Sequence, residues 1–247
     1  MKIYAIIPAR YGSTRFPGKP LAPIAGKPMI QHVYEHALAC PEVLEVFVAT
    51  DDDRISGCVR DFGGKTVMTK KGHPSGTDRI AEASQKMNLQ QDDLIVNIQG
   101  DQPLFHPSSI SQLIRPLMGD RNIPMSTLKY QITDELEIQN PNNVKVVTDR
   151  DGFALFFSRS PLPFYRDPKS SRRHYKHLGF YAYAMGFLSK FVTLPVGQLE
   201  SAEKLEQLRA LEYGYRIKVE ETQFDSVEVD TPEDAQKVEM LLAKSGS

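Results

Sequence analysis

Short runs of apolar, mostly β-branched residues recur along the chain and alternate with segments of helical periodicity. The runs that read as strands are residues 3–9, 45–50, 65–69, 94–99, 144–149 and 217–222. Several of them are apolar almost throughout, which is typical of strands that are buried on both faces of a sheet. The pattern therefore predicts a core of largely parallel strands.

Amphipathic helices are predicted between these strands. In residues 30–38 the apolar side chains follow the spacing of one helix face, and Pro28 lies near the first turn. Near the end of the chain, Thr231 is a predicted N-cap, Pro232 takes the first helical position, and Glu233 and Asp234 fall in the first turn. The alternation predicts a three-layer α/β/α, Rossmann-like fold around a mixed, mainly parallel sheet.

Residues 124–183 depart from this alternation, because strand-like runs follow one another there with little helix between them. We interpret this segment as a small antiparallel extension that serves dimerisation or sugar binding. No repeat or low-complexity linker divides the chain, so we expect a single domain over residues 1–247.

Composition excludes some classes of function. The chain is 40% hydrophobic and 25% charged, and its formal net charge of −1 leaves no surplus for binding a polyanion. The apolar start is cut off by Pro8 and Arg10 and is too short for a signal peptide or a membrane span. Cys40 and Cys58 have no metal-site spacing, and we interpret them as reduced thiols of a cytoplasmic protein.

The first predicted strand runs into a basic, glycine-rich loop, IPARYGSTRFPGKPL, at residues 7–21. In a doubly wound sheet, ligands bind beyond the carboxyl ends of the strands, where this loop begins. Arg10 and Arg15 can bind phosphate oxygens in a fork and Lys19 adds a point charge, so the loop favours a polyphosphate. Neither the Walker spacing nor GxGxxG is present. A solvated turn with scattered cations is the structural alternative.

Two acidic residues end other predicted strands. Asp101 follows Gly100 after the run at 94–99, and Asp230 ends an extended segment just before the last helix. Two carboxylates beside a polyphosphate would repel it unless Mg²⁺ lies between them, so we expect a metal site here. Asp230 alone is equally explained by the favourable position of an acid at a helix start.

A second acidic run, Asp51 to Asp53, resembles the DxD metal motif of glycosyltransferases. An N-cap followed by acidic first-turn residues explains the same run, and we prefer that interpretation.

A set of motifs then occurs in order from end to end: the loop at 7–21, GKPMIQHVYEHA, VATDD, SGTDRI, VNIQGDQP, PNNVKVV, ALFFSRSPLPF, KHLGFYAY, ESAEKLEQLRALEYG and VEVDTPED. With them the chain closely resembles bacterial CMP-Kdo synthetases, the 3-deoxy-manno-octulosonate cytidylyltransferases. The resemblance implies a nucleotidyltransferase fold and transfer of CMP from CTP to a 3-deoxy-octulosonic acid, with release of pyrophosphate. It also implies Mg²⁺ dependence, a cytoplasmic homodimer and a place in lipopolysaccharide inner-core synthesis.

The resemblance implies roles for individual residues. Arg10, Ser13 and Lys19 would hold the triphosphate, with Asp101 and Asp230 as metal ligands. Ala9 and the turn Ser75, Gly76 and Thr77 would lie near the cytidine. The sugar-side residues implied are Gln99, Arg159, His177, Glu206 and Gln207.

Residue types alone support the sugar-side assignments less strongly. Arg159 suits the carboxylate of the sugar but could be a surface strand residue, and a lone His177 is more often a core histidine. Glu206 and Gln207 lie on a predicted helix with the apolar stripe Ala202, Leu205, Leu208 and Leu211. By that periodicity they face solvent.

The chain also departs from the common family pattern. Gln102 replaces a Glu near the expected metal, Asp78 replaces another Glu, Phe164 replaces a frequent Trp, and Ala184 replaces an Arg expected near the sugar. These changes resemble the branch that activates the 8-amino-8-deoxy form of the sugar. Remaining alternatives are a cytidylyltransferase for another sugar acid such as sialic acid, a metal-dependent glycosyltransferase, and a non-catalytic nucleotide-binding module.

Overall fold

A computed structural model describes residues 1–12, 16–167 and 172–245. The strands are β1 Ile3–Ala9, β2 Pro23–Ile24, β3 Lys27–Pro28, β4 Glu45–Thr50, β5 Lys65–Met68, β6 Leu94–Asn97, β7 Met125–Gln131, β8 Lys145–Thr148, β9 Ala154–Ser158, β10 Tyr175–Ala184 and β11 Ile217–Thr222. The helices are η1 Lys19–Leu21, α1 Met29–Leu38, α2 Asp53–Asp61, α3 Gly76–Lys86, α4 Ser108–Gly119, α5 Glu135–Gln139, α6 Met185–Phe191, α7 Gln198–Glu203, α8 Leu208–Glu212 and α9 Pro232–Ser245.

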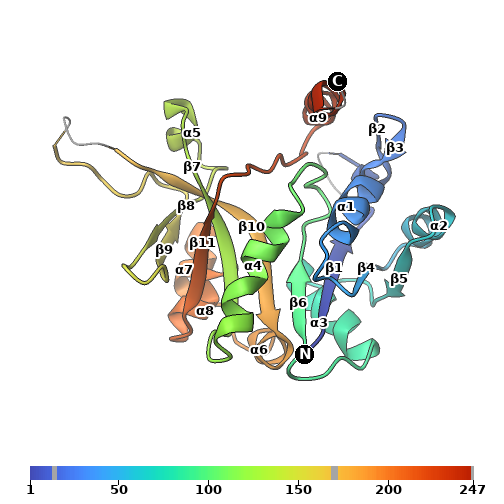
Figure 1. Cartoon of the computed structure of the whole chain (residues 1–247), viewed down its shortest axis with the longest axis horizontal. Coiled ribbons are helices and arrows are strands. Elements are labelled where there is room, and N and C mark those ends of the chain that lie inside the picture. The colour runs from blue at the N-terminus through green and yellow to red at the C-terminus, as the bar shows by residue number, and fades with distance from the viewer. Residues whose placement is uncertain (13–15, 168–171, 246–247) are drawn as a thin grey trace.

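The main sheet has the strand order β11-β7-β10-β6-β1-β4-β5 (Figure 1). Strands β6, β1, β4 and β5 are parallel to their neighbours in this group, and β11 is parallel to β7. Strand β10 runs antiparallel to both β6 and β7. The mixed, mainly parallel α/β sheet predicted from the sequence is confirmed.

Alternation along β1 builds the two faces of this sheet. Ile3, Ala5 and Ile7 pack into one core with the apolar sides of α1, α2 and α4. Tyr4 and Ile6 pack into a second core with α3, α6 and α8. Successive side chains of a strand point to opposite faces, so a strand buried on both sides is apolar throughout. The result is three layers, with α1 and α4 in front of the sheet in Figure 1.

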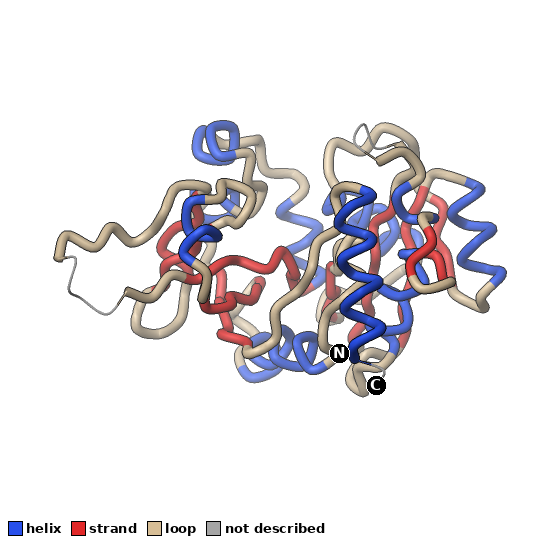
Figure 2. Tube along the Cα trace, turned by 90° about the horizontal axis from the view of Figure 1, so that it is seen from above, coloured by secondary structure: helices blue, strands red, loops and turns tan. Residues whose placement is uncertain are grey.

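Residues 124–183 are antiparallel, but they are more than an extension. Strands β7 and β10 are integral to the main sheet, where β10 joins β7 to β6. Strands β8 and β9 pair antiparallel with each other, and β8 touches β10 at one position. They lie with α5 and α7 at the left-hand end of the molecule in Figure 1, which the view from above also separates from the parallel half (Figure 2).

The C-terminal segment crosses the upper edge of the sheet from β11 to α9 (Figure 1). Helix α9 begins as expected, because Thr231 Oγ1 accepts a hydrogen bond from Asp234 N and Asp234 Oδ2 accepts one from Thr231 N. A third, small core joins this segment to the opening loop through Ile24, Met29, Val229 and Val238. Within the described part of the chain, each helix is too short or too polar to traverse a lipid bilayer.

Candidate active site

The carboxyl ends of β1 and β6 meet at the upper edge of the sheet. The two strands pair in parallel register from Ile3 opposite Leu94 to Ile6 opposite Asn97. A Cβ atom at Gly100 would lie 2.9 Å from the carbonyl oxygen of Pro8, so only glycine lets the chain pass here. The close approach places Asp101 beside the residue from which the opening loop starts.

The opening loop turns back at Gly18. The Gly18 amide donates a hydrogen bond to the carbonyl of Tyr11 at 3.0 Å. The φ angle of Gly18 is 71°, a left-handed conformation that favours glycine. The one-turn helix η1 follows immediately, and this turn aims the side chain of Lys19 at the end of β6.

Lys19 lies between the two acidic strand ends. Its Nζ donates to Asp101 Oδ2 at 2.7 Å, to the Val229 carbonyl at 2.9 Å and to Asp230 Oδ1 at 3.3 Å. The structure thus brings together Asp101 and Asp230, which are 129 positions apart in the printed numbering. It also shows Lys19 in contact with these carboxylates, whereas the resemblance implied a triphosphate contact.

Glu228 joins this pair of carboxylates and was not predicted. Oxygen atoms of Asp101, Glu228 and Asp230 all lie within 4.8 Å of one another. Residues 227–230 are extended, so Glu228 and Asp230 point to the same side while Val229 is buried on the other. The alternation in Val-Glu-Val-Asp was the signal that could have identified Glu228.

The donor set suits a hard divalent cation. Carboxylate oxygens are the ligands that Mg²⁺ and Ca²⁺ prefer, and here they converge from two separate segments. Asp101 and Asp230 are partly buried and Glu228 is exposed, so the group opens toward solvent on one side. The residues present therefore fit the metal that the sequence led us to expect.

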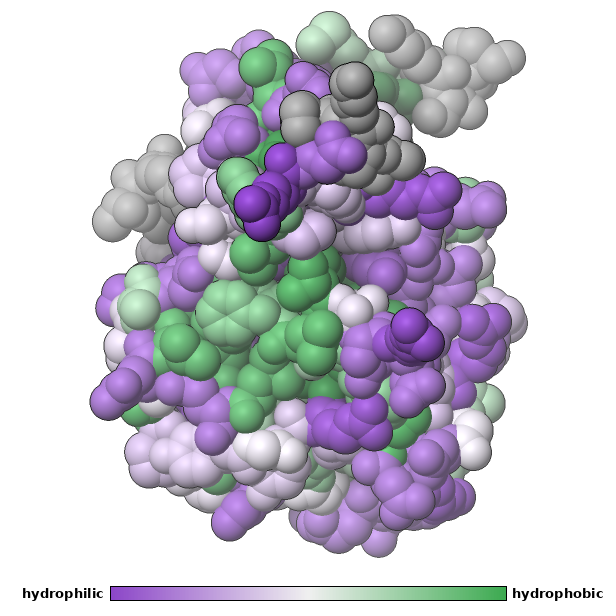
Figure 3. All heavy atoms as spheres, turned by 90° about the vertical axis from the view of Figure 1, so that its left-hand side faces the viewer, coloured by the Kyte–Doolittle hydropathy of each residue, from purple (hydrophilic) through white to green (hydrophobic). Residues whose placement is uncertain are grey.

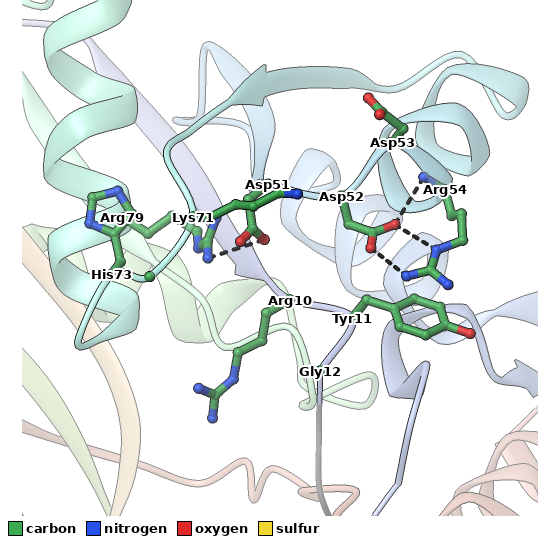
Figure 4. A pocket seen from close by; sticks show the side chains of 11 residues that line it. Arg10, Tyr11, Gly12, Asp51, Asp52, Asp53, Arg54, Lys71, His73 and Arg79 are labelled. Carbon is green, nitrogen blue, oxygen red and sulfur yellow. Dashed lines mark hydrogen bonds and ion pairs between the residues drawn. The ribbon is translucent and has the colours of Figure 1, made fainter.

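A polar cavity of about 640 Å³ adjoins the opening loop (Figure 4). Its lining residues are Arg10, Tyr11, Gly12, Asp51, Asp52, Asp53, Arg54, Lys71, Gly72, His73 and Arg79. The exposed side chain of Arg10 points away from the acidic residues in Figure 4. Ala9, at the end of β1, is buried. Ser13 and Arg15, also expected to bind phosphate, lie outside the described residues.

The acidic run at 51–53 is held by neighbouring cations. Asp52 is the N-cap of α2, and its Oδ1 accepts a hydrogen bond from Arg54 N at 3.0 Å. Asp51 Oδ1 lies 3.2 Å from Arg79 Nη2, and Asp53 is in the first helical turn. These contacts confirm the N-cap interpretation over the glycosyltransferase motif.

The turn Ser75, Gly76 and Thr77 opens helix α3. Ser75 is its N-cap and accepts a hydrogen bond from Asp78 N. A Cβ atom at Gly76 would lie 3.2 Å from Pro8 Cγ, so this turn is packed against the end of β1. Thr77 Oγ1 donates to Glu206 Oε2 at 2.6 Å. The expected cytidine turn and the expected sugar side therefore meet at this bond.

The prediction that Glu206 and Gln207 face solvent is wrong. The expected helix is broken at Lys204, whose φ of 55° ends α7, and α8 begins only at Leu208. Helical periodicity does not hold across this break, and Gln207 is only 5% exposed. Glu206 Oε1 and Gln207 Nε2 are both buried without a hydrogen-bond partner among the described residues.

Burial raises the pKa of Glu206. Hydrogen bonds from Thr77 and Ser75 and the charge of Arg209 oppose this effect but do not cancel it. Arg209 is held by Glu200, through a fork of two hydrogen bonds of 2.7 and 2.6 Å. This buried pair fixes α8 next to Glu206.

His177 lies on β10 at the start of a bulge. Its Nε2 is 2.8 Å from Thr127 Oγ1, and its ring packs against the rings of Phe157 and Tyr181. Burial lowers the pKa of His177 to about 3, so the ring is neutral at physiological pH. Gln99 follows β6 and its Nε2 is 3.4 Å from Asn97 Oδ1.

Arg159 is engaged by its own chain. Its Nε donates to the Glu203 carbonyl at 2.7 Å and its Nη1 to the Pro141 carbonyl at 2.9 Å, while its amide donates to Glu203 Oε2. A bidentate bond to a sugar carboxylate through Nε would have to replace the bond to Glu203.

Two family departures have structural explanations. Gln102 Nε2 donates to the Leu178 carbonyl at 2.8 Å, a bond that an ionised Glu could not donate. Ala184 pairs with Leu94, at the amino end of β6, so it lies at the sheet edge opposite Asp101. The expectation that position 184 lies near the sugar is therefore wrong.

Fold and site together define a nucleotide-handling α/β protein, with its cations and acidic residues gathered at one sheet edge. The cytidylyltransferase family model matches residues 4–219. A 3-deoxy-manno-octulosonate cytidylyltransferase of Syntrophus aciditrophicus is 56% identical over 98% of this chain and 97% of its own. An 8-amino-3,8-dideoxy-manno-octulosonate cytidylyltransferase of Shewanella oneidensis is 54% identical over 98% of this chain and 99% of its own.

Solved structures agree with these relatives. A CMP:2-keto-3-deoxy-manno-octonic acid synthetase complexed with CTP superposes with a TM-score of 0.93. It is 44% identical in sequence, and the match covers 99% of this chain and all of that chain. The chain belongs to the cytidylyltransferase family.

Proposed function

We propose that this protein transfers CMP from CTP to 3-deoxy-manno-octulosonate or to its 8-amino-3,8-dideoxy form and releases pyrophosphate. The observation that carries the proposal is the meeting of Lys19, Asp101 and Asp230 at one sheet edge. Relatives bearing both activities in their names match nearly the whole chain.

On the nucleotide side, the chain supplies cations and a backbone turn. The exposed Arg10 and the nearby Lys19 can pair with the triphosphate, while Ala9 and the turn at 75–77 bound the place for the cytidine. The anomeric hydroxyl of the sugar attacks the α-phosphorus and pyrophosphate leaves. Positioning and charge neutralisation dominate such reactions, so a dedicated protein base is not required.

Asp101 and Asp230 would hold Mg²⁺ at this edge, and the convergence of carboxylate oxygens supports the assignment. When bound, the ion supplies neutralisation of phosphate charge and a lower pKa for the attacking hydroxyl. The position of the two aspartates would therefore determine where the hydroxyl of the sugar must lie to lose its proton.

On the sugar side, orphaned polar atoms define what a ligand must offer. Glu206 Oε1 has only a long ionic contact of 3.7 Å with Arg209 Nη2 and can accept a hydrogen bond, and Gln207 Nε2 can donate one. Sugar hydroxyls can be partners for both atoms. Gln99, His177 and Arg159 complete the proposed pocket. Because His177 is neutral, it can exchange hydrogen bonds with hydroxyls without adding charge.

We also propose a homodimer. Figure 3 shows apolar side chains gathered on the left-hand end of the molecule. Among the exposed large apolar residues, Leu155 of β9 is 62% exposed and Phe164 of the following loop is 89% exposed. A patch of this kind marks an association surface, and a second copy is the partner that the family resemblance implies. Leu155→Glu is expected to yield monomers in light scattering.

We place the reaction in the cytoplasm, where CTP is available. The free thiols of Cys40 and Cys58 support a reducing compartment. The activated octulosonate would then supply lipopolysaccharide inner-core synthesis.

The deciding experiment measures pyrophosphate release with each of the four nucleoside triphosphates. Acceptors are 3-deoxy-manno-octulosonate, its 8-amino analogue and a sialic acid. Selective release with CTP and an octulosonate supports the proposal. Release with sialic acid, or binding of CTP without any acceptor-dependent release, would overturn it.

A further inference from the structure

Lys19 is a built-in part of the acidic site. Its side chain is 13% exposed, and its ammonium contacts three oxygens from two segments, including 2.7 Å to Asp101 Oδ2. Long surface lysines usually gain little from ion pairs, but a desolvated pair with several partners is a fixed element of the site.

The backbone at Lys19 is also fixed. Its amide donates to the Phe16 carbonyl and its carbonyl accepts from Ala22, while Pro20 restricts the next residue. Ile24 and Phe16 pack into the small core that contains Val229 and α9. The same core thus supports both the cation and the strand end that carries Asp230.

The ammonium and a divalent cation need the same oxygens. A metal ion bound to both Asp101 Oδ2 and Asp230 Oδ1 would compete for the two oxygens that Lys19 Nζ contacts and would lie close to the ammonium. Two cations at such close range repel strongly in a partly desolvated site. Lys19 must therefore withdraw before these two oxygens can bind the metal together.

A triphosphate bound by Arg10 of the same loop, as in the proposed function, would offer the ammonium other anionic oxygens. We propose that Lys19 is an exchangeable counter-ion: it pairs with Asp101 and Asp230, offsetting part of their charge, until the triphosphate draws its ammonium away. Metal binding at the aspartate pair then depends on nucleotide. The inference rests on the proposed metal site, and it makes binding ordered, with nucleotide before metal.

Nucleotide and metal binding are coupled because each favours the state in which Lys19 has left the aspartates. The coupling must be reciprocal, so that each ligand raises the affinity for the other by the same factor. Removing the ammonium should let metal bind without nucleotide. It should also lower the affinity for the nucleotide, because the triphosphate loses one cationic partner.

The test titrates Mn²⁺, as a probe for Mg²⁺, into nucleotide-free protein and follows bound ion by electron paramagnetic resonance. Wild type is compared with Lys19→Met. Lys27→Met is the matched control, because the Lys27 side chain is exposed and its Nζ pairs with the surface residue Glu35 at 2.7 Å. Thermal melts verify that each variant is folded.

We expect Lys19→Met to bind Mn²⁺ at least tenfold more tightly than wild type, within the usual range of site coupling. Lys27→Met should match wild type. Equal or weaker Mn²⁺ binding by folded Lys19→Met would overturn the counter-ion role and show that Lys19 only supports the site.

A second arm separates this result from failure of the metal site itself. Asp101→Asn and Asp230→Asn are introduced together into Lys19→Met, and the added Mn²⁺ affinity should disappear. Mn²⁺ binding is also measured with a non-hydrolysable CTP analogue, for wild type and for the variant that carries only Asp101→Asn and Asp230→Asn. The proposed metal site fails if wild type binds no more Mn²⁺ than this variant does and no more than the analogue does without protein. If that excess is present but Lys19→Met changes nothing without nucleotide, only the exchange proposal fails.

Discussion

The proposed nucleotide side and the proposed sugar side of the site are built in different ways. On the nucleotide side, Lys19, Asp101 and Asp230 follow regular strands or a tight turn, and their charges face one another. On the proposed sugar side, Glu206 and Gln207 lie in a break between two short helices. Among the described residues, Glu206 Oε1 and Gln207 Nε2 are buried without a hydrogen-bond partner, although Arg209 Nη2 lies 3.7 Å from Glu206 Oε1.

The first region depends mainly on ionic pairs, and the second depends mainly on hydrogen bonds. On the proposed nucleotide side, Lys19 already pairs with Asp101 and Asp230, so we expect ligands there to act by exchanging ionic partners. The sugar side retains unmet hydrogen bonds, which cost free energy until a ligand with matching donors and acceptors fills them. We therefore expect Glu206 and Gln207 to determine selectivity for the sugar, and Asp101 and Asp230 to determine the rate of CMP transfer.

The largest expected effect is on the nucleotide side. Asp101→Asn should lower kcat by about 10²–10³-fold, because a charged ligand of the proposed metal is lost. CTP affinity should stay within a few-fold, measured by calorimetry beside the pyrophosphate assay. Asp53→Asn is the control, since Asp53 lies in a helical first turn. Normal turnover by Asp101→Asn with Mg²⁺ would remove the metal assignment.

On the sugar side, Glu206→Gln should act on KM for the sugar acid. Losing a charged hydrogen-bond acceptor costs about 1.5–3 kcal/mol, or roughly 10–100-fold in KM. The amide oxygen can still accept from Thr77, so the fold and KM for CTP should hardly change. Steady-state kinetics with each substrate varied in turn checks this. An equal rise in both KM values would contradict the division of the site.

Arg159 sharpens the comparison, because it is committed to its own chain. Arg159→Met should lower the free energy of unfolding by about 1–3 kcal/mol through loss of two carbonyl contacts. Its effect on KM for the sugar should be smaller than that of Glu206→Gln. Denaturant titration and kinetics measure the two effects. A large rise in KM with unchanged stability would instead make Arg159 a direct carboxylate ligand.

A prediction about pH concerns stability and not turnover. His177 has a folded pKa of about 3 against 6.5 for the free side chain, so the unfolded chain binds an extra proton between these values. Stability should therefore fall as the pH drops from 6.5 toward 3. His177→Gln, which can still bond Thr127, should lose less stability over this range. The melting temperature of both proteins is measured as a function of pH. If it falls equally in both between pH 6.5 and 3, His177 does not take up a proton on unfolding.

The sequence analysis succeeded where one local pattern determined the outcome. The bounds predicted for β1, β4 and β11 match the structure, because apolar alternation and buried position agree there. Asp101 could be placed at the ligand edge because it follows a buried parallel strand. The cap of α9 followed from Thr231 and Asp234.

The sequence analysis was wrong where a local pattern was interrupted or where distant segments determined the structure. The stripe from Ala202 to Leu211 looks continuous, but the left-handed turn at Lys204 resets the helical phase and turns Gln207 inward. Position 184 was misplaced because the direction of β10 is set by its pairing with β6 and β7. Pairing direction depends on distant segments, and no neighbouring residue reveals it.

The contact between Lys19 and Asp230 spans 211 positions of the chain. A polypeptide emerges from the ribosome with its N-terminus first, and a closure this long forms late. The opening loop that carries Lys19 is therefore made early, but Asp230 is added only when synthesis is nearly finished. The proposed metal site is thus completed only when nearly the whole chain has been synthesised.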